Sequence, residues 1–249
     1  MFGKVALLFW GLTRGLKHVQ YSIMENIVYP LTNSGYQVDI FIHTYYFKGE
    51  YTNERHNISS MKLDFDEYKL LNPKYFLIED QDEVKKKLDL KKFRKQKDHF
   101  KNGYQSNDFY ILSLYSQSQI TRLFMKHKEE YRFCFFVRPD VKFLKPININ
   151  WLGLVQPNTI LVPGWANYKH KKAYSENDRF CICHPDDAYK YGDLLEILLP
   201  YSKHQPIVAE FFLGFALNVF HKMNVSRIHY IFQRVLPNGE IHKSDIKLR

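Results

Sequence analysis

The chain has 249 residues, a hydrophobic fraction of 45% and a formal net charge of +10 at pH 7. These values exclude a disordered chain, because the apolar residues suffice to fill the core of one large domain. The charge favours an acidic partner, which can be nucleic acid, an anionic membrane or a phosphorylated small molecule. The odd number of cysteines, three, favours a reducing compartment over a disulfide framework, so we expect a cytoplasmic protein without a membrane span.

The first half of the chain is typical of strands that alternate with helices. Residues 5–10 and 38–44 are expected strands, and the segment 19–31 between them is an expected helix because its apolar residues recur every four positions. The default pairing of two strands joined in this way is parallel. A further strand is expected at 75–79. The basic stretch 85–101 is interpreted as a solvated helix rather than a specific nucleic-acid site.

Other segments complete the expected fold. The polar segment 45–75 is expected to be a loop with one short strand at 61–63, and a helix over 111–124 leads into the apolar run 133–137. Five consecutive apolar residues in that run predict a central strand that is buried on both faces. In the second half we expect strands at 159–163, 179–184 and 228–235, helices after Pro185 and over 208–219, and a mobile tail beyond residue 239.

A charged pair follows the expected central strand. Arg138-Pro139-Asp140 ends the run, because proline cannot donate a ladder hydrogen bond. The arginine and aspartate therefore lie at the carboxyl edge of the sheet, where open α/β sheets bind ligands. The alternative interpretation is a surface salt bridge that only closes the strand.

Other polar residues stand at strand ends. Gly11 allows a tight turn after the first strand, and Arg14 in the same turn offers donors suited to phosphate. His43 and Thr44 end the second strand. Asp178 precedes an expected strand. Further candidates are Glu210, which begins an expected helix, and the loop aromatics Trp165 and Tyr168, which can stack on a sugar or close over the core.

These features together resemble GT-A-like glycosyltransferases, and more narrowly a group of polysaccharide-building transferases of bacteria and large DNA viruses. The matching motifs, which span most of residues 1–235, are the Gly11 to Arg14 turn, the strand from Asp39 to Thr44, Tyr115-Ser116-Gln117, Arg138-x-Asp140, and Asn177-Asp178-x-Phe180. The resemblance implies a Rossmann-like GT-A fold with a mixed, mainly parallel central sheet flanked by helices. It further implies a single domain over 1–249, in which about 1–145 binds the nucleotide sugar and about 146–249 forms the acceptor side.

The implied activity is transfer of a hexosyl or pentosyl group from a UDP- or GDP-linked sugar to a hydroxyl of a glycan acceptor. The donor-binding residues implied by the resemblance are Gly11, Arg14, His43, Thr44, Arg138 and Asp140. Asp140 is also the implied ligand of Mn²⁺ or Mg²⁺, which oxygen ligands and phosphates suit. Asp178 is the first candidate for the catalytic base and Glu210 the second.

One position departs from the family. GT-A enzymes have Asp-x-Asp where this chain has Arg138-x-Asp140, and a guanidinium there can replace part of the work of the cation. A late histidine, His229 or His242, can complete a metal shell, although a lone histidine is more often structural. Three alternatives stay open: a non-catalytic nucleotide or sugar-binding module, a protein whose basic face over 85–101 binds nucleic acid or anionic lipid, and a nucleotide-sugar hydrolase.

Overall fold

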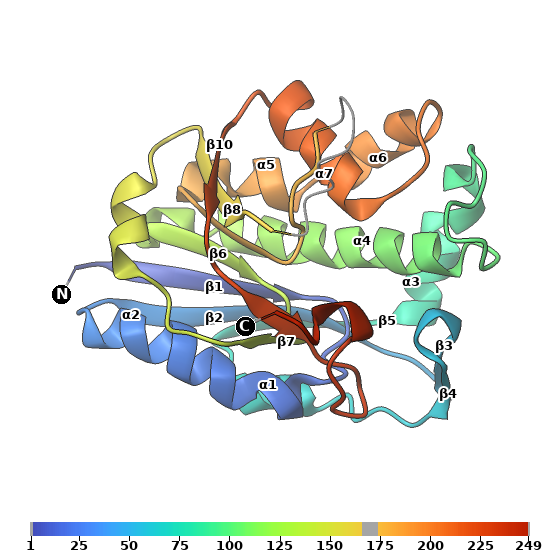
Figure 1. Cartoon of the computed structure of the whole chain (residues 1–249), viewed down its shortest axis with the longest axis horizontal. Coiled ribbons are helices and arrows are strands. Elements are labelled where there is room, and N and C mark those ends of the chain that lie inside the picture. Colours follow the sequence, from blue (N-terminus) through green and yellow to red (C-terminus); the bar gives the residue numbers. More distant parts are fainter. Residues whose placement is uncertain (1, 166–173, 249) are drawn as a thin grey trace.

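The computed structural model describes residues 2–165 and 174–248, and its centre is a seven-stranded sheet (Figure 1). The strand order is β10–β8–β9–β6–β1–β2–β5, and every neighbouring pair is parallel except the two pairs that contain β9. The predicted fold class, a mixed and mainly parallel sheet flanked by helices, is therefore confirmed. The strands are β1 (Lys4–Trp10), β2 (Gln37–Tyr46), β5 (Tyr75–Asp80), β6 (Phe133–Val137), β8 (Thr159–Pro163), β9 (Phe180–Cys183) and β10 (Asn224–Ile228).

Strands β1 and β6 lie at the middle of the sheet because both of their faces are apolar. Along β1, Leu7 belongs to the hydrophobic cluster on one face and Leu8 to the cluster on the other face. Phe135 and Phe136 of β6 divide in the same way, and none of these four side chains is exposed. This alternation with a period of two residues is what a strand covered on both sides requires.

Helices cover both faces of the sheet. Figure 1 shows α1 (Leu16–Ile23) and α2 (Tyr29–Asn33) below the sheet, and a π-helical turn over Met24–Val28 joins them into one segment. The other face carries α4 (Gln105–Met125), α5 (Ala188–Gly192), α6 (Leu195–Ser202) and α7 (Ala209–Phe215), which continues into a π-helical turn over Ala216–Phe220. Within the described part of the chain, no helix is long and apolar enough to cross a bilayer.

The predicted helix over 85–101 is wrong beyond Phe93. Helix α3 (Gln81–Leu88) ends at Asp89, whose φ of 46° is left-handed, and a 3₁₀ turn over Leu90–Phe93 follows. The carboxylate of Asp98 then accepts backbone N–H bonds from Phe100, Asn102 and Tyr104 at 2.8–3.0 Å. These bonds satisfy the backbone in a loop and so compete with the helix.

The C-terminal part also differs from the prediction. The expected strand 228–235 is wrong in its bounds, because β10 ends at Ile228. β11 (Phe232–Arg234) lies outside the main sheet and pairs antiparallel with β7 (Val141–Phe143). The tail expected to be mobile folds back on β11, where the guanidinium of Arg234 binds both carboxylate oxygens of Asp245 at 2.8 Å. Where one short strand was expected at 61–63, β3 (Tyr51–Asn53) and β4 (Ile58–Met61) form a hairpin.

Gly192 provides a test of the packing between the helices and the sheet. A Cβ atom at this position would lie 2.0 Å from Oγ1 of Thr121 in α4 and 2.7 Å from the ring of Phe136 in β6. We expect Gly192→Ala to lower the free energy of unfolding by about 2 kcal/mol, because overpacking a dense core forces side chains off their rotamers. The midpoint of urea unfolding measures this change.

Gly153 is the matched control, because a Cβ atom there would meet nothing within 4 Å. Gly153→Ala should change stability by less than about 0.5 kcal/mol. Equal unfolding midpoints for the two variants would contradict the packing described for α4, α5 and β6.

Candidate functional site

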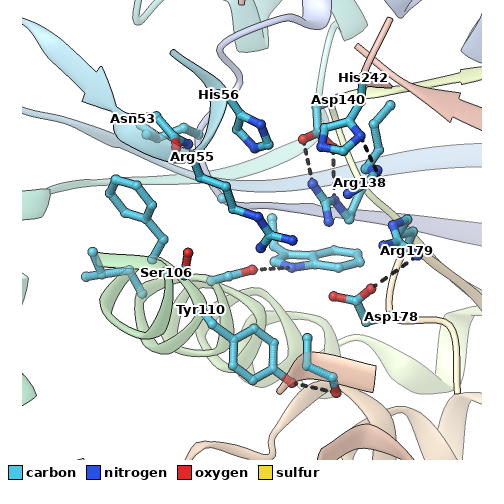
Figure 2. A pocket seen from close by; sticks show the side chains of 18 of the residues that line it. Asn53, Arg55, His56, Ser106, Tyr110, Arg138, Asp140, Asp178, Arg179 and His242 are labelled. Carbon is cyan, nitrogen blue, oxygen red and sulfur yellow. Dashed lines mark hydrogen bonds and ion pairs between the residues drawn. The ribbon is translucent and has the colours of Figure 1, made fainter. Parts of the chain in front are cut away.

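A cavity of about 510 Å³ opens at the carboxyl ends of β1 and β6. Its charged lining includes residues from both halves of the chain, and Figure 2 shows Arg55, His56, Arg138, Asp140, Asp178, Arg179 and His242 around it. In that view the two histidines lie on one side of the cavity, while Asp178 and Tyr110 of α4 lie on the other side. The predicted residues Gly11, Arg14 and Glu210 also line it.

The direction of β9 explains why these residues meet. Because β9 runs antiparallel to β6, Phe180 at the start of β9 pairs with Val137 at the end of β6. The pairing continues beyond the strands, where the backbone N–H of Arg138 donates to the carbonyl of Arg179 at 3.2 Å. Asp178, which precedes β9, is therefore held at the same sheet edge as the residues that follow β6.

Arg138 and Asp140 form a bidentate ion pair in the cavity wall. Nε of Arg138 donates to Oδ1 of Asp140 at 2.9 Å, and Nη2 donates to Oδ2 at 2.6 Å. Nη2 of Arg14 lies 3.9 Å from the same Oδ2 atom. Burial alone would raise the pKa of Asp140, but the charge and hydrogen bonds of Arg138, with Arg14 and Arg234 farther away, lower it to about 2. Both carboxylate oxygens are thus committed to guanidinium groups.

A second acidic group consists of Asp178 and Glu210, with Arg179 between them. Nη2 of Arg179 donates to Oε1 of Glu210 at 3.1 Å, and Nη1 lies 3.8 Å from Oδ1 of Asp178. That Oδ1 atom is buried without a hydrogen-bond partner. Burial and then the charge of Asp178 raise the pKa of Glu210, although Arg179 opposes this shift. Such a pair can accept a proton from a bound hydroxyl group.

The segment that carries Asp178 is fastened to α7. The carboxylate of Glu176 is fully buried, binds Arg227 at 3.1 and 2.7 Å and accepts from Asn218 at 3.3 Å. The backbone N–H of Glu176 donates to the carbonyl of Glu210 at 3.0 Å. Gly214 permits this approach, because a Cβ atom at position 214 would lie only 2.5 Å from the carbonyl group of Tyr174.

His43 and Thr44 are buried behind the cavity and do not line it. Nδ1 of His43 lies 2.6 Å from Oγ of Ser116, and Nε2 lies 2.8 Å from Oε2 of Glu79. Oγ of Ser116 accepts the backbone N–H of Gly11 at 2.7 Å. His43 therefore supports the Gly11 turn from within the core instead of facing the cavity.

The sequence analysis missed many of the residues that line the cavity, among them Arg55, His56, Arg234 and Tyr110. The first two stand in a segment expected to be an irregular loop, and Arg234 meets them because β11 leaves the main sheet. His242, which the sequence suggested only as a metal ligand, stands in the tail expected to be mobile. The rings of His56 and His242 lie 4.9 Å apart. Burial and neighbouring positive groups lower the pKa of each to about 4. No signal in the sequence links these distant segments.

The side chains present do not fit a resident metal ion. Among residues 2–165 and 174–248, no three or more His, Cys, Asp or Glu side chains are grouped as metal ligands. Asp140, the predicted ligand, is paired with Arg138 through both oxygens. His229 is exposed and outside the cavity lining. We therefore assign no chemical step to a metal held by this chain.

Of the two loop aromatics that the sequence offered for stacking on a sugar, only Trp165 is among the described residues. Trp165 does not line the cavity, and its indole N–H donates to the carbonyl of Tyr230 at 2.6 Å. Its ring packs edge-on against Phe232 at a centroid distance of 4.9 Å. Tyr168 lies outside the described residues.

No protein-family model matches the chain, and no curated protein matches it. Among solved structures, 192 chains match. One is the crystal structure of mouse xyloside xylosyltransferase 1 in its apo form, with a TM-score of 0.43 and 11% sequence identity over 90% of this chain and 84% of that chain. A likeness at this level carries no argument about activity, and the narrower resemblance to bacterial and viral transferases gains no support from these comparisons.

The ion pair in the cavity wall yields a stability prediction. Asp140→Ala leaves the guanidinium of Arg138 largely buried and without its carboxylate partner, so we expect a loss of about 3 kcal/mol in unfolding free energy. The double variant Arg138→Met/Asp140→Ala should recover at least about 1 kcal/mol of that loss, because it removes the stranded charge as well. Urea unfolding of Asp140→Ala, of Arg138→Met and of the double variant measures the coupling between the two side chains. Additive losses would show that the pair is not coupled.

Proposed function

We propose that this protein is a glycosyltransferase that moves a sugar from a nucleoside-diphosphate sugar to a hydroxyl group of a carbohydrate acceptor. The observation that carries this proposal is one cavity lined both by arginines, among them Arg14, Arg55 and Arg138, and by the Asp178–Glu210 pair. Transfer of a sugar from a diphosphate needs positive groups that stabilise the leaving diphosphate and a carboxylate that accepts the proton of the acceptor hydroxyl. The motif resemblance described above favours the same reaction, with a UDP- or GDP-linked donor.

The reaction requires two kinds of charge control. The bond between the anomeric carbon and the diphosphate oxygen breaks, and negative charge develops on the leaving nucleoside diphosphate. The acceptor oxygen forms the new bond to the anomeric carbon and gives up its proton to a carboxylate. The products are the glycosylated acceptor, the nucleoside diphosphate and a protonated carboxyl group, which later loses its proton to water.

Asp178 is our first candidate for the base. Its Oδ1 atom has no hydrogen-bond partner, whereas Oε1 of Glu210 already accepts from Arg179. Glu210 has the complementary property of a raised pKa. When the pH falls, Glu210 therefore takes up a proton before an ordinary glutamate does, and the charge of the pair changes.

The donor is proposed to lie against the turn after β1 and the end of β6. Gly11, Arg14, Arg138 and Asp140 line that part of the cavity. Most of this wall comes from the first 145 residues, and Asp178 and Glu210 come from the remainder. His242 is an exception, because it belongs to the second part of the chain and yet lines the proposed donor side of the cavity.

A thermal-shift panel of nucleoside diphosphates and nucleotide sugars tests donor binding. A ligand at one hundred times its dissociation constant should stabilise the protein by about 2.7 kcal/mol, which gives a clear rise in Tm. Uridine and guanosine compounds are expected to give the largest rise. Nucleosides without phosphate are the control and should give little shift. No shift with any diphosphate would contradict the proposed donor.

Variants of the carboxylate pair test the chemistry. Asp178→Asn should lower the rate of sugar transfer by about 10² to 10⁴-fold, since it removes a general base. Transfer is measured with labelled UDP- or GDP-sugars and a panel of glycan acceptors. The control is Glu196→Gln, which changes an exposed carboxylate outside the cavity and should leave the rate unchanged. Full activity of Asp178→Asn would remove Asp178 from the mechanism.

The raised pKa of Glu210 predicts a pH dependence. A carboxyl group with a raised pKa is protonated at a higher pH than usual, so kcat/KM should fall on the acid side from a pH above the ordinary range of glutamate. Glu210→Gln should shift this fall to lower pH. An acid limb that is the same in the wild type and in Glu210→Gln would contradict the assignment.

A further inference from the structure

We propose that the diphosphate of the donor binds directly to N–H groups of Arg14, Arg55 and His242, without a divalent cation held by Asp140. The inference rests on the proposed function, because it names how that donor is held. It differs from the metal-assisted arrangement that the resemblance implies. Three independent features of the cavity support it.

The first feature is the state of Asp140. A carboxylate that binds a divalent cation needs at least one oxygen free to face the ion. Here Oδ1 and Oδ2 of Asp140 each accept a hydrogen bond from Arg138, at 2.9 and 2.6 Å. A cation at Asp140 would also lie beside the guanidinium groups of Arg138 and Arg14, and these positive charges would repel it.

The second feature is the tautomer of His242. Its Nδ1 atom accepts the backbone N–H of Ser244 at 3.2 Å and lies 3.1 Å from Nη2 of Arg234, which can only donate. Oγ of Ser244, 2.9 Å from Nδ1, can donate or accept, whereas the other two groups can only donate. We therefore infer that Nδ1 is the acceptor in the neutral ring and that the hydrogen resides on Nε2. A ring in this tautomer presents an N–H donor and no lone pair at Nε2, so it suits a phosphate oxygen and not a metal ion. The lowered pKa of His242 agrees with a neutral ring.

The third feature is the fixed position of two arginines. Arg14 donates to the hydroxyl of Tyr51, and its guanidinium lies 5.0 Å from the centre of that ring. The same hydroxyl accepts from Asn53 at 2.9 Å. Arg55 lies over the ring of Phe100 at 4.6 Å, and Figure 2 shows its guanidinium pointing into the cavity. Arginines held on aromatic rings lose less side-chain entropy when they bind an anion.

The charge of the cavity agrees with an anionic ligand. Among the described residues, five arginines and three carboxylates line it. Asp245, just outside the lining, pairs with one of those arginines, Arg234, so the formal excess is one positive charge with the histidines taken as neutral. His56, whose pKa is lowered to about 4, adds a second neutral imidazole beside His242. The excess of positive charge favours an anionic ligand such as a diphosphate. A divalent ion would instead add to positive charge that is already present.

Titration calorimetry with inorganic pyrophosphate tests the inference on the full chain. We expect pyrophosphate to bind in buffer with EDTA, and Arg55→Gln and Arg14→Gln each to weaken binding at least tenfold, since each removes a charge-assisted hydrogen-bond donor. His242→Phe, which keeps the ring and removes its N–H group, should also weaken binding. Lys97→Gln is the matched control, because it removes an exposed cation outside the cavity lining.

Two results would overturn the inference. One is pyrophosphate binding that disappears in EDTA and returns with Mn²⁺ or Mg²⁺. The other is wild-type affinity in both arginine variants. Arg55 is exposed, so Arg55→Gln is expected to fold, and its unfolding midpoint checks this directly.

Calorimetry together with the sugar-transfer assay separates this inference from the proposed function. Binding of pyrophosphate in EDTA by a protein that transfers no sugar would leave the inference standing and reject the transferase. Sugar transfer that requires a divalent cation and is unaffected by Arg14→Gln and Arg55→Gln would support the transferase and reject the inference.

Discussion

The antiparallel direction of β9 is the constraint on which the site depends. In a fully parallel sheet the residues before a strand lie at the opposite edge from the residues after its neighbour. Because β9 runs against β6, Asp178 at its start and Arg138 at the end of β6 share one edge, and the bond from the N–H of Arg138 to the carbonyl of Arg179 fixes their register. One reversed strand thereby brings the proposed base to the edge where we propose that the donor binds.

The carboxylates of the cavity lie in two different electrostatic environments, each with an arginine beside it. The guanidinium of Arg138 neutralises Asp140, and Arg179 lies between Asp178 and Glu210. Asp140 therefore has a lowered pKa, whereas the pKa of Glu210 is raised by burial and by its acidic neighbour. Environments that separate the pKa values of carboxyl groups in this way are typical of sites that handle protons. The proposed division of labour, phosphate at the arginines and proton at the acidic pair, follows from this pattern.

Local patterns in the sequence predicted every strand of the main sheet except β10, because hydrophobic runs and strand-breaking prolines act within a few residues. They placed Arg138 and Asp140 at the carboxyl edge of the sheet, whereas Asp178 reaches that edge only because β9 is antiparallel to β6, which no local pattern predicted. They failed where distant contacts decide. His43 was expected at a strand end, but it lies within β2 and faces Ser116 in the core. The tail with His242 is ordered by Arg234 and Asp245. Arg55 gave no signal, since its role depends on where the β3–β4 hairpin folds.

The central claim is that one sheet edge holds both the diphosphate and the base. A crystal structure of the full chain with a bound nucleoside-diphosphate sugar, grown in EDTA, tests this most directly. The account predicts diphosphate oxygens within hydrogen-bond distance of Arg14 and Arg55, with the sugar turned towards Asp178. A nucleotide bound at the opposite edge of the sheet, or a diphosphate seated on a cation beside Asp140, would contradict it.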